Sequence, residues 1–208
     1  MTLTANTEVD ICNNGLDLIG ARPINSIVNP TTDKEATCAR LYKMTVSGLL
    51  SRHDWKFTNQ MKQLAHNADQ DPFGGKAYAY KLPSLLLAGP FSVYEASNLG
   101  RPVHNYIHAR DHIHTDNNTC YVRYHEKTLV ETWPEYFVHL ASVACASVFA
   151  KPIAESGEMA TEYRIQAFGS ANENGEGGLF GAYKGIDSKS APLKSLFRNG
   201  DPLTGLVY

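Results

Sequence analysis

Histidine is the residue type whose spacing in this sequence most suggests chemistry. Four histidines fall within eleven residues, and a fifth follows in the next segment that we expect to be extended. On a strand, His112 and His114 would point to the same face, and His125 could lie opposite them across a turn. Imidazole nitrogens bind zinc and copper, so this arrangement is a candidate metal site. The five histidines are His104, His108, His112, His114 and His125.

A structural role is the alternative for these histidines. No cysteine or carboxylate stands beside them at a recognised metal-ligand spacing. They would then form the polar, solvent-facing side of a sheet whose Tyr106, Ile107 and Ile113 help to cover a core. We therefore expect no bound metal and no cofactor.

Hydrolytic chemistry would need a nucleophile with a base, or two carboxylates set apart by a substrate. The sequence has no Gly-x-Ser-x-Gly motif, and Gly74-Gly75-Lys76 lacks the other residues of a phosphate-binding loop. Glu126, Glu131 and Glu135 are close in sequence, but solvation and helix capping account for them. We expect no catalytic residue in this chain.

Composition indicates an ordinary globular protein. Of its 208 residues, 43% are hydrophobic and 19% charged, and the formal net charge of -2 offers no general basic field for nucleic acid. The N-terminus lacks the pattern of a signal peptide, and the longest apolar run, residues 137–150, is too short to span a membrane. The four cysteines have no redox or metal-site spacing and are expected to be buried and reduced: Cys12, Cys38, Cys120 and Cys145.

Three Thr-x-x-acid patterns predict where helices begin. In such a capping box, the threonine and the acidic side chain each accept a hydrogen bond from a free backbone N–H of the first turn. Gly20 should end the first helix, and Lys151-Pro152 should end the third. The patterns are Thr7 with Asp10, Thr32 with Glu35, and Thr132 with Glu135, and the predicted helices span residues 7–20, 32–52, 134–150 and 155–168.

The middle of the chain changes to an extended pattern. Residues 77–83 are followed by three short segments, at 103–108, 111–115 and 120–125, with turn residues between them. We expect an antiparallel β meander inserted at about residues 76–126. The predicted fold class is therefore α+β, mainly α: a small helical bundle with an inserted β meander and an extended C-terminal arm.

The composition shifts again at Gly169. Half of the 16 glycines lie in residues 169–208, together with apolar residues that show no sustained period. We expect residues 1–168 to form one domain and residues 169–208 to form an arm that becomes ordered on a partner. An arm folded back on its own core is the alternative. The residues expected to bind the partner are Leu193, Leu196, Phe197, Leu206 and Tyr208.

The order of several short motifs resembles a known family. The first helix ends in a Gly-x-x-Pro-Ile turn at residues 20–24, and the second is followed by Trp-x-Phe at residues 55–57. A Tyr-x-Leu-Pro strand end, a Cys-Tyr-Val-Arg-Tyr strand and a Trp-Pro helix start come next, at residues 80–83, 120–124 and 133–134. From about Thr7 to Phe168, this order is similar to that of the head–tail adaptors of tailed bacteriophages, of the tail tubular protein A type.

The resemblance implies a structural virion protein, made in the bacterial cytoplasm and located in the neck of the virion. Such subunits assemble as a ring, commonly of twelve copies, between the capsid portal and a tail nozzle or other tail protein. DNA would pass through the lumen without specific binding, and no membrane is involved. The alternative is a virion-associated glycan or peptidoglycan hydrolase with a connector role, which a paired-carboxylate cleft would favour. A metal-binding module built on the histidines is a third possibility.

Overall fold

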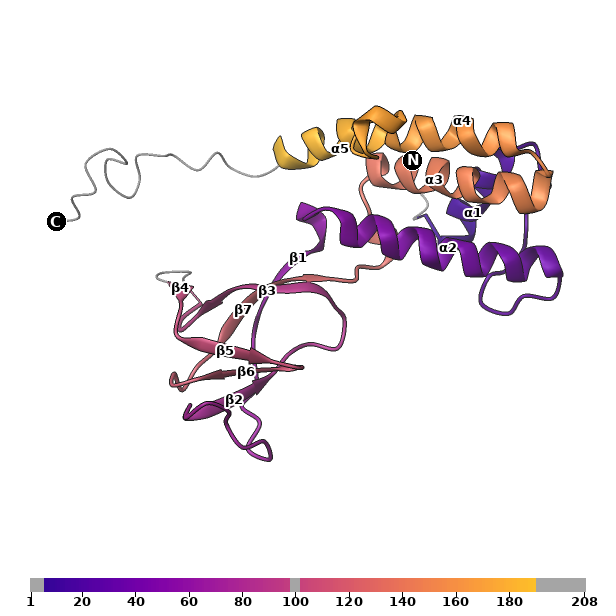
Figure 1. Cartoon of the computed structure of the whole chain (residues 1–208). Coiled ribbons are helices and arrows are strands. Elements are labelled where there is room, and N and C mark those ends of the chain that lie inside the picture. Colours follow the sequence, from indigo (N-terminus) through magenta and orange to yellow (C-terminus); the bar gives the residue numbers. More distant parts are fainter. Residues whose placement is uncertain (1–5, 98–101, 190–208) are drawn as a thin grey trace, which may run out of the picture.

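Two lobes make up the part of the chain that the computed structural model describes, residues 6–97 and 102–189 (Figure 1). A β lobe, residues 59–126, is inserted between the second and third helices of a helical lobe, so the expected α+β, mainly helical class is confirmed. The elements in chain order are α1 (Glu8–Leu18), α2 (Asp33–Arg52), η1 (Lys56–Thr58), β1 (Asn59–Gln63), β2 (Tyr78–Lys81), β3 (Leu86–Tyr94), β4 (Pro102–Val103), β5 (Tyr106–Ala109), β6 (His112–Thr115), β7 (Tyr121–Glu126), η2 (Val130–Thr132), α3 (Glu135–Ala154), α4 (Gly157–Phe168), η3 (Ala171–Glu173) and α5 (Gly178–Lys189).

Two of the three expected capping boxes are confirmed. Thr7 with Asp10 begins α1, and Thr32 with Glu35 begins α2, each with both reciprocal hydrogen bonds. Gly20 follows the end of α1 in the left-handed region, with a φ of 68°, as its expected role as a stop requires.

Glu35 does more than cap α2. Its buried carboxylate accepts hydrogen bonds from the backbone N–H groups of Asn25, Thr31 and Thr32, and from the Thr31 hydroxyl. These bonds, first of all those from Thr31, lower the pKa of Glu35 to about 2. The side chain therefore stabilises the loop that precedes α2 more strongly when it is ionised than when it is protonated.

Replacing this carboxylate should lower the stability by an amount that depends on pH. A group whose pKa is lowered in the folded state stabilises it above the ordinary pKa, and this contribution disappears as the pH falls through the folded value. We expect Glu35→Gln to lower the melting temperature at neutral pH, and the difference from the parent to vanish near pH 2. Thermal unfolding across this range measures it. Glu158→Gln, at an exposed first-turn position of α4, is the control, and a deficit of equal size at all pH values would contradict the assignment.

The prediction of a third capping box, formed by Thr132 and Glu135, was wrong. Pro134 is the N-cap of α3, and the Thr132 hydroxyl donates instead to the carbonyl of Leu129 within η2. The expected end at Lys151-Pro152 was also wrong, because α3 continues to Ala154. Pro152 lies in the last turn, where its missing N–H leaves unpaired only the carbonyl of the half-buried Val148.

Helix α3 is the centre of the helical lobe. Its small residues allow α1 to approach closely, since a Cβ at Gly15 would lie 3.1 Å from the Cβ of Cys145. Helices α1 and α2 pack on one side of α3, and α4 and α5 on the other (Figure 1). By length and composition α3 could also cross a membrane, but most of it is buried in the core, as expected of the central helix of a bundle.

The strands form two antiparallel sheets rather than one meander. The first sheet has the order β1-β7-β3-β4 and the second the order β2-β6-β5. The expected hairpin of β5 and β6 is present, with Ile107 opposite His114, but β7 leaves it and pairs with β1 and β3. The antiparallel pairing was predicted, whereas strands β1 and β3 were not. Because β7 pairs with these two strands, it does not pair with β6.

The expectation of an extended arm from Gly169 was wrong for the residues that the structure describes. Residues 178–189 form α5, and Phe180 on this helix is fully buried against Trp55 and Phe168. Asp187 is 1% exposed and accepts hydrogen bonds from the backbone N–H of Lys56 and from the Tyr136 hydroxyl. Burial of an aromatic ring and a satisfied carboxylate outweighs the low helix propensity of the glycines.

Two tryptophans mark where the chain leaves and re-enters the helical lobe. Trp55 follows α2 and is fully buried, with its indole N–H donating to the carbonyl of Leu49 at 2.9 Å. Trp133 precedes α3, and both indoles meet the ring of Phe137 edge-on, at 5.0 and 4.8 Å. Both connections to the β lobe are therefore fixed on one aromatic ring.

Candidate functional site

The histidines do not converge on one centre. His104 and His108 are exposed on the β5 side of the second sheet, while His125 lies on β7 in the first sheet. His112 and His114 do share a face of β6, as expected, with ring centroids 6.2 Å apart. Among residues 6–97 and 102–189, no group of three or more histidines, cysteines or acidic residues is arranged to hold a metal ion.

Structural hydrogen bonds occupy the two histidines of β6. His112 lies 2.8 Å from the Asp111 carboxylate and 3.0 Å from the Asn67 amide nitrogen. The buried His114 accepts from the backbone N–H of Phe73 at 3.1 Å. Burial lowers the pKa of His114, and the nearby His112 lowers it further. Both rings therefore fasten the loop before β2 onto the second sheet.

A threonine, a histidine and an aspartate meet at the joint of the lobes in an order that superficially resembles a catalytic triad. The Thr58 hydroxyl lies 2.6 Å from Nδ1 of His125, whose Nε2 is 3.7 Å from the Asp54 carboxylate. Thr58 is only 1% exposed, and its hydroxyl donates to the carbonyl of Trp55 at 2.8 Å. A nucleophile must reach its substrate. This group therefore connects β7 to η1 and offers no accessible nucleophile.

The clustered glutamates also lie apart. Glu126 ends β7, while Glu131 and Glu135 border two different hollows of the surface. Glu131 and Glu135 consequently do not face each other across one substrate-sized cleft, which is what the hydrolase alternative requires. The four cysteines are all buried and unpaired, as expected for their structural role.

A mainly apolar hollow lies between α2 and the linker of residues 127–133, which returns the chain from the β lobe to α3. We call it the α2–linker groove; its volume is about 500 Å³, within the usual range of roughly 300–1,000 Å³ for binding pockets. Two leucines at its rim, Leu85 and Leu129, are 53% and 73% exposed. Its principal apolar lining is Tyr42, Val46, Leu85, Leu129, Val130 and Trp133.

The polar groups of this groove include one without a partner. Tyr42 is 4% exposed, and its hydroxyl forms no hydrogen bond with any described residue. Burial raises the pKa of Tyr42, and nearby Glu8, Cys12, Cys145 and Glu131 raise it further, so the hydroxyl stays protonated and can donate. Lys43 and Lys127 complete a rim with charges of both signs. An apolar floor, a free donor and a charged rim suit a segment of another protein.

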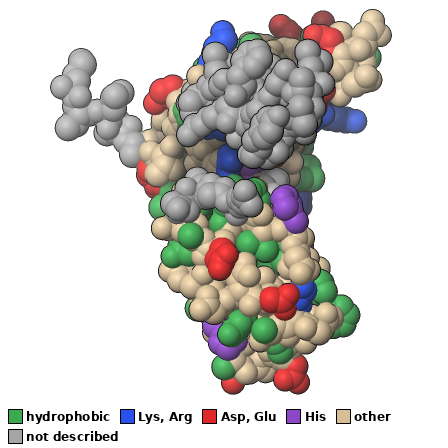
Figure 2. Space-filling view, turned by 90° about the vertical axis from the view of Figure 1, so that its left-hand side faces the viewer, with side chains coloured by type: hydrophobic (Ala, Val, Ile, Leu, Met, Phe, Trp, Pro, Cys, Tyr) green, Lys and Arg blue, Asp and Glu red, His purple; other side chains and the backbone are tan. Residues whose placement is uncertain are grey.

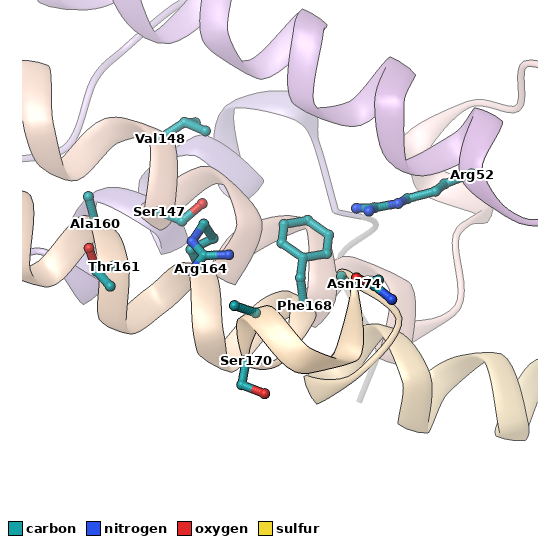
Figure 3. A pocket seen from close by; sticks show the side chains of 11 residues that line it. Arg52, Ser147, Val148, Ala160, Thr161, Arg164, Phe168, Ser170 and Asn174 are labelled. Atoms are coloured by element: carbon teal, nitrogen blue, oxygen red, sulfur yellow. The ribbon is translucent and has the colours of Figure 1, made fainter.

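A second hollow, of about 600 Å³, lies between α3, α4 and the residues around η3. Figure 3 shows the ring of Phe168 between the side chains of Arg52 and Arg164. The Arg52 guanidinium lies 5.0 Å from the centre of this ring, and neither arginine forms a hydrogen bond or ion pair with a described residue. Guanidinium groups can bind a carboxylate or a phosphate, and Arg52 already lies close enough to Glu176 to lower the pKa of that carboxyl.

Basic side chains do not gather on the face of the β lobe that Figure 2 shows. On the face that Figure 2 shows, acidic and histidine side chains are spread over this lobe, and lysines and arginines are few. A surface that binds the DNA backbone would present a basic patch or stripe there.

The sequence alone predicted neither of the two hollows described above. The predicted partner-binding residues Leu193, Leu196, Phe197, Leu206 and Tyr208 lie outside the described residues. The groove combines residues from α2, the loop before β3 and the linker, which only the fold brings together. An isolated Leu129 between Thr128 and Val130 gives no periodic signal that it would be exposed.

Comparisons with known proteins identify no family for this chain. No model of a known protein family matches it, and no curated protein matches it.

Proposed function

We propose that this chain is a structural subunit of a ring that joins the capsid portal of a tailed bacteriophage to its tail. The observation that carries the proposal is where the resembling motifs fall in the fold. Trp55 and Trp133, from the Trp-x-Phe and Trp-Pro motifs, both pack on Phe137 where the chain leaves and re-enters the helical lobe. A subunit of a closed ring must hold its two lobes in one fixed arrangement, and these residues fix the connections between the lobes.

The surface supports an assembly role rather than catalysis. A closed ring needs two complementary surfaces on each subunit, because each copy contacts two neighbours. The α2–linker groove offers one such surface, with leucines exposed to water that a partner would cover. A net charge of -2 suits a lumen through which DNA passes without specific binding.

In this proposal the protein is located in the virion neck and needs no cofactor. Its partners are further copies of itself, the portal protein and the first protein of the tail. Twelve copies would form the ring, one for each portal subunit, with the portal serving as the template for assembly.

Mixing the purified full chain with portal rings tests this stoichiometry. We expect a complex whose mass corresponds to one copy of this chain per portal subunit, because each portal subunit repeats the same binding surface around the ring. Native mass spectrometry of the isolated complex gives the ratio, and portal rings alone are the control. No complex, or any other ratio, would contradict the proposal.

A further inference from the structure

The α2–linker groove has the properties of a docking site with a specific occupant. We propose that it binds residues 190–208 of a neighbouring copy of this chain. The inference rests on the proposed ring, since it assigns the contact that links one subunit to the next.

The exposed leucines are the first reason. Leu129 and Leu85 are 73% and 53% exposed, and they stand over the buried Val130 and Trp133. Exposing such an apolar surface to water is unfavourable, and covering it with another apolar segment lowers the free energy. The groove is also long enough to require a chain segment, since its lining runs from Ala39 to Ser47 along α2.

The free hydroxyl of Tyr42 is the second reason. A buried hydroxyl without a partner costs free energy, and such groups in native proteins are usually satisfied by something. Tyr42 lines the groove, but its hydroxyl is shielded from solvent, so a peptide lying there could offer it a backbone carbonyl only after the lining side chains shift. An occupant with a polypeptide backbone would therefore complete the hydrogen bonding of the helical lobe.

The chemistry of residues 190–208 matches the groove. Leu193, Leu196 and Phe197 have the i, i+3, i+4 spacing of apolar anchors that bind in a groove. Lys194 and Arg198 lie beside these anchors. Two carboxylates of the groove rim, Glu8 and Glu131, could pair with them, beside the rim's own Lys43 and Lys127.

The arrangement of the helices favours a neighbouring copy as the donor. Phe180 and Asp187 fasten α5 to the helical lobe, so the segment begins from a fixed point at Lys189. Helix α5 packs on α4 and α3, whereas the groove lies on the α2 side of α3 (Figure 1). A segment that leaves one side of each subunit and a groove on the other side give a head-to-tail contact, which is the kind that closes a ring.

Photo-cross-linking in the full chain tests the inference. A chain with Phe197→benzoylphenylalanine is mixed with an equal amount of ¹⁵N-labelled parent chain, with and without portal rings, and cross-links are mapped by mass spectrometry. We expect cross-links from position 197 to groove residues near Leu129 that carry the heavy isotope. Cross-links to light chains only, to residues outside the groove, to the portal alone, or none at all would overturn the inference.

Variants in the labelled chain separate groove binding from folding. Leu129→Glu should lower the yield of the intermolecular cross-link roughly tenfold or more, because it places a charge where an apolar contact is expected. Phe73→Glu is the matched control: this residue is 63% exposed on the β lobe, and the yield should stay within about twofold. An equal loss in both variants would contradict the assignment of the groove.

Tyr42→Phe distinguishes a binding role of the Tyr42 hydroxyl from a role in the stability of the subunit. Removing a hydroxyl that has no partner among the described residues should leave the melting temperature of the free chain unchanged or raised. The cross-link yield should nevertheless fall by about threefold to tenfold, because the occupant loses its donor. An unchanged yield would show that the hydroxyl does not contact the segment.

Failure of this inference is distinguishable from failure of the proposed function. Portal rings that carry one copy per subunit without groove cross-links would overturn the docking of residues 190–208 and leave the adaptor proposal standing. Groove cross-links between copies that bind no portal would do the reverse.

Discussion

Phe180→Ala is expected to destabilise the protein by about 3–5 kcal/mol, the usual cost of truncating a fully buried phenylalanine. The ring fills the space between Trp55 and Phe168, and the Arg52 guanidinium lies 5.3 Å from its centre. In a chain of this length the loss corresponds to a fall in melting temperature of roughly 6–20 °C. Thermal unfolding followed by circular dichroism measures it.

The control for this substitution lies on the same helix. Ile186→Ala removes a side chain that is 48% exposed, so its effect should stay within about 0.5–1 kcal/mol. Deleting residues 190–208 should leave the melting temperature within about 2 °C of the parent, because the described cores remain complete. Deleting from Gly169, by contrast, removes Phe180 and should unfold the helical lobe. Equal stability of the two truncated chains would show that α5 is not part of the core.

Asp187→Ala should release α5 from the joint of the lobes. The carboxylate accepts from the Lys56 backbone N–H at 3.0 and 3.1 Å and from the Tyr136 hydroxyl at 2.8 Å. Losing it leaves these two donors without their acceptor, and each such group costs about 1–3 kcal/mol. We therefore expect a loss of about 2–6 kcal/mol and faster hydrogen exchange throughout Gly178–Lys189.

Asp187→Asn tests whether the acceptor oxygen is what matters. Asparagine keeps one oxygen, so it should preserve part of the stability and leave α5 better protected than alanine does. Identical exchange in α5 for the parent and for Asp187→Ala would contradict the anchoring role. If α5 is released as expected, the cross-link from position 197 should also weaken, because residues 190–208 would no longer begin from a fixed point.

The starts of the helices show what local sequence patterns can predict and what they cannot. Thr7 with Asp10 and Thr32 with Glu35 form capping boxes because each pair satisfies free N–H groups within one turn of the backbone. Thr132 and Glu135 have the same spacing, but Pro134 intervenes and its extended backbone makes it the N-cap of α3. The pattern was identical, and only the conformation of the proline determined the outcome.

Helix α5 and the strands β1 and β3 were missed because tertiary contacts decide them. Three glycines within α5, at positions 178, 181 and 185, lower its helix propensity by about 1 kcal/mol each, and burial of Phe180 offsets this. Strand β1, with mostly exposed polar residues, shows no alternation, since it is an edge strand paired only with β7. Gly89-Pro90 inside β3 has the composition of a turn.

The candidate site was less predictable than the fold for the same reason. The histidines were recognisable from their spacing, but pairing of β7 with β1 separates His125 from His112 and His114. The α2–linker groove depends on where α2, the loop before β3 and the linker meet, which no local pattern encodes.

The position of the protein in the virion tests the adaptor proposal most directly. Under the adaptor proposal a tailed phage encodes this chain, and cryo-electron microscopy of that phage's neck should show the two lobes repeated as a ring between the portal and the first tail protein. The proposal predicts one copy for each portal subunit, with the groove of every copy covered by its neighbour. Virions that lack the chain, or that carry it anywhere other than the neck, would contradict it.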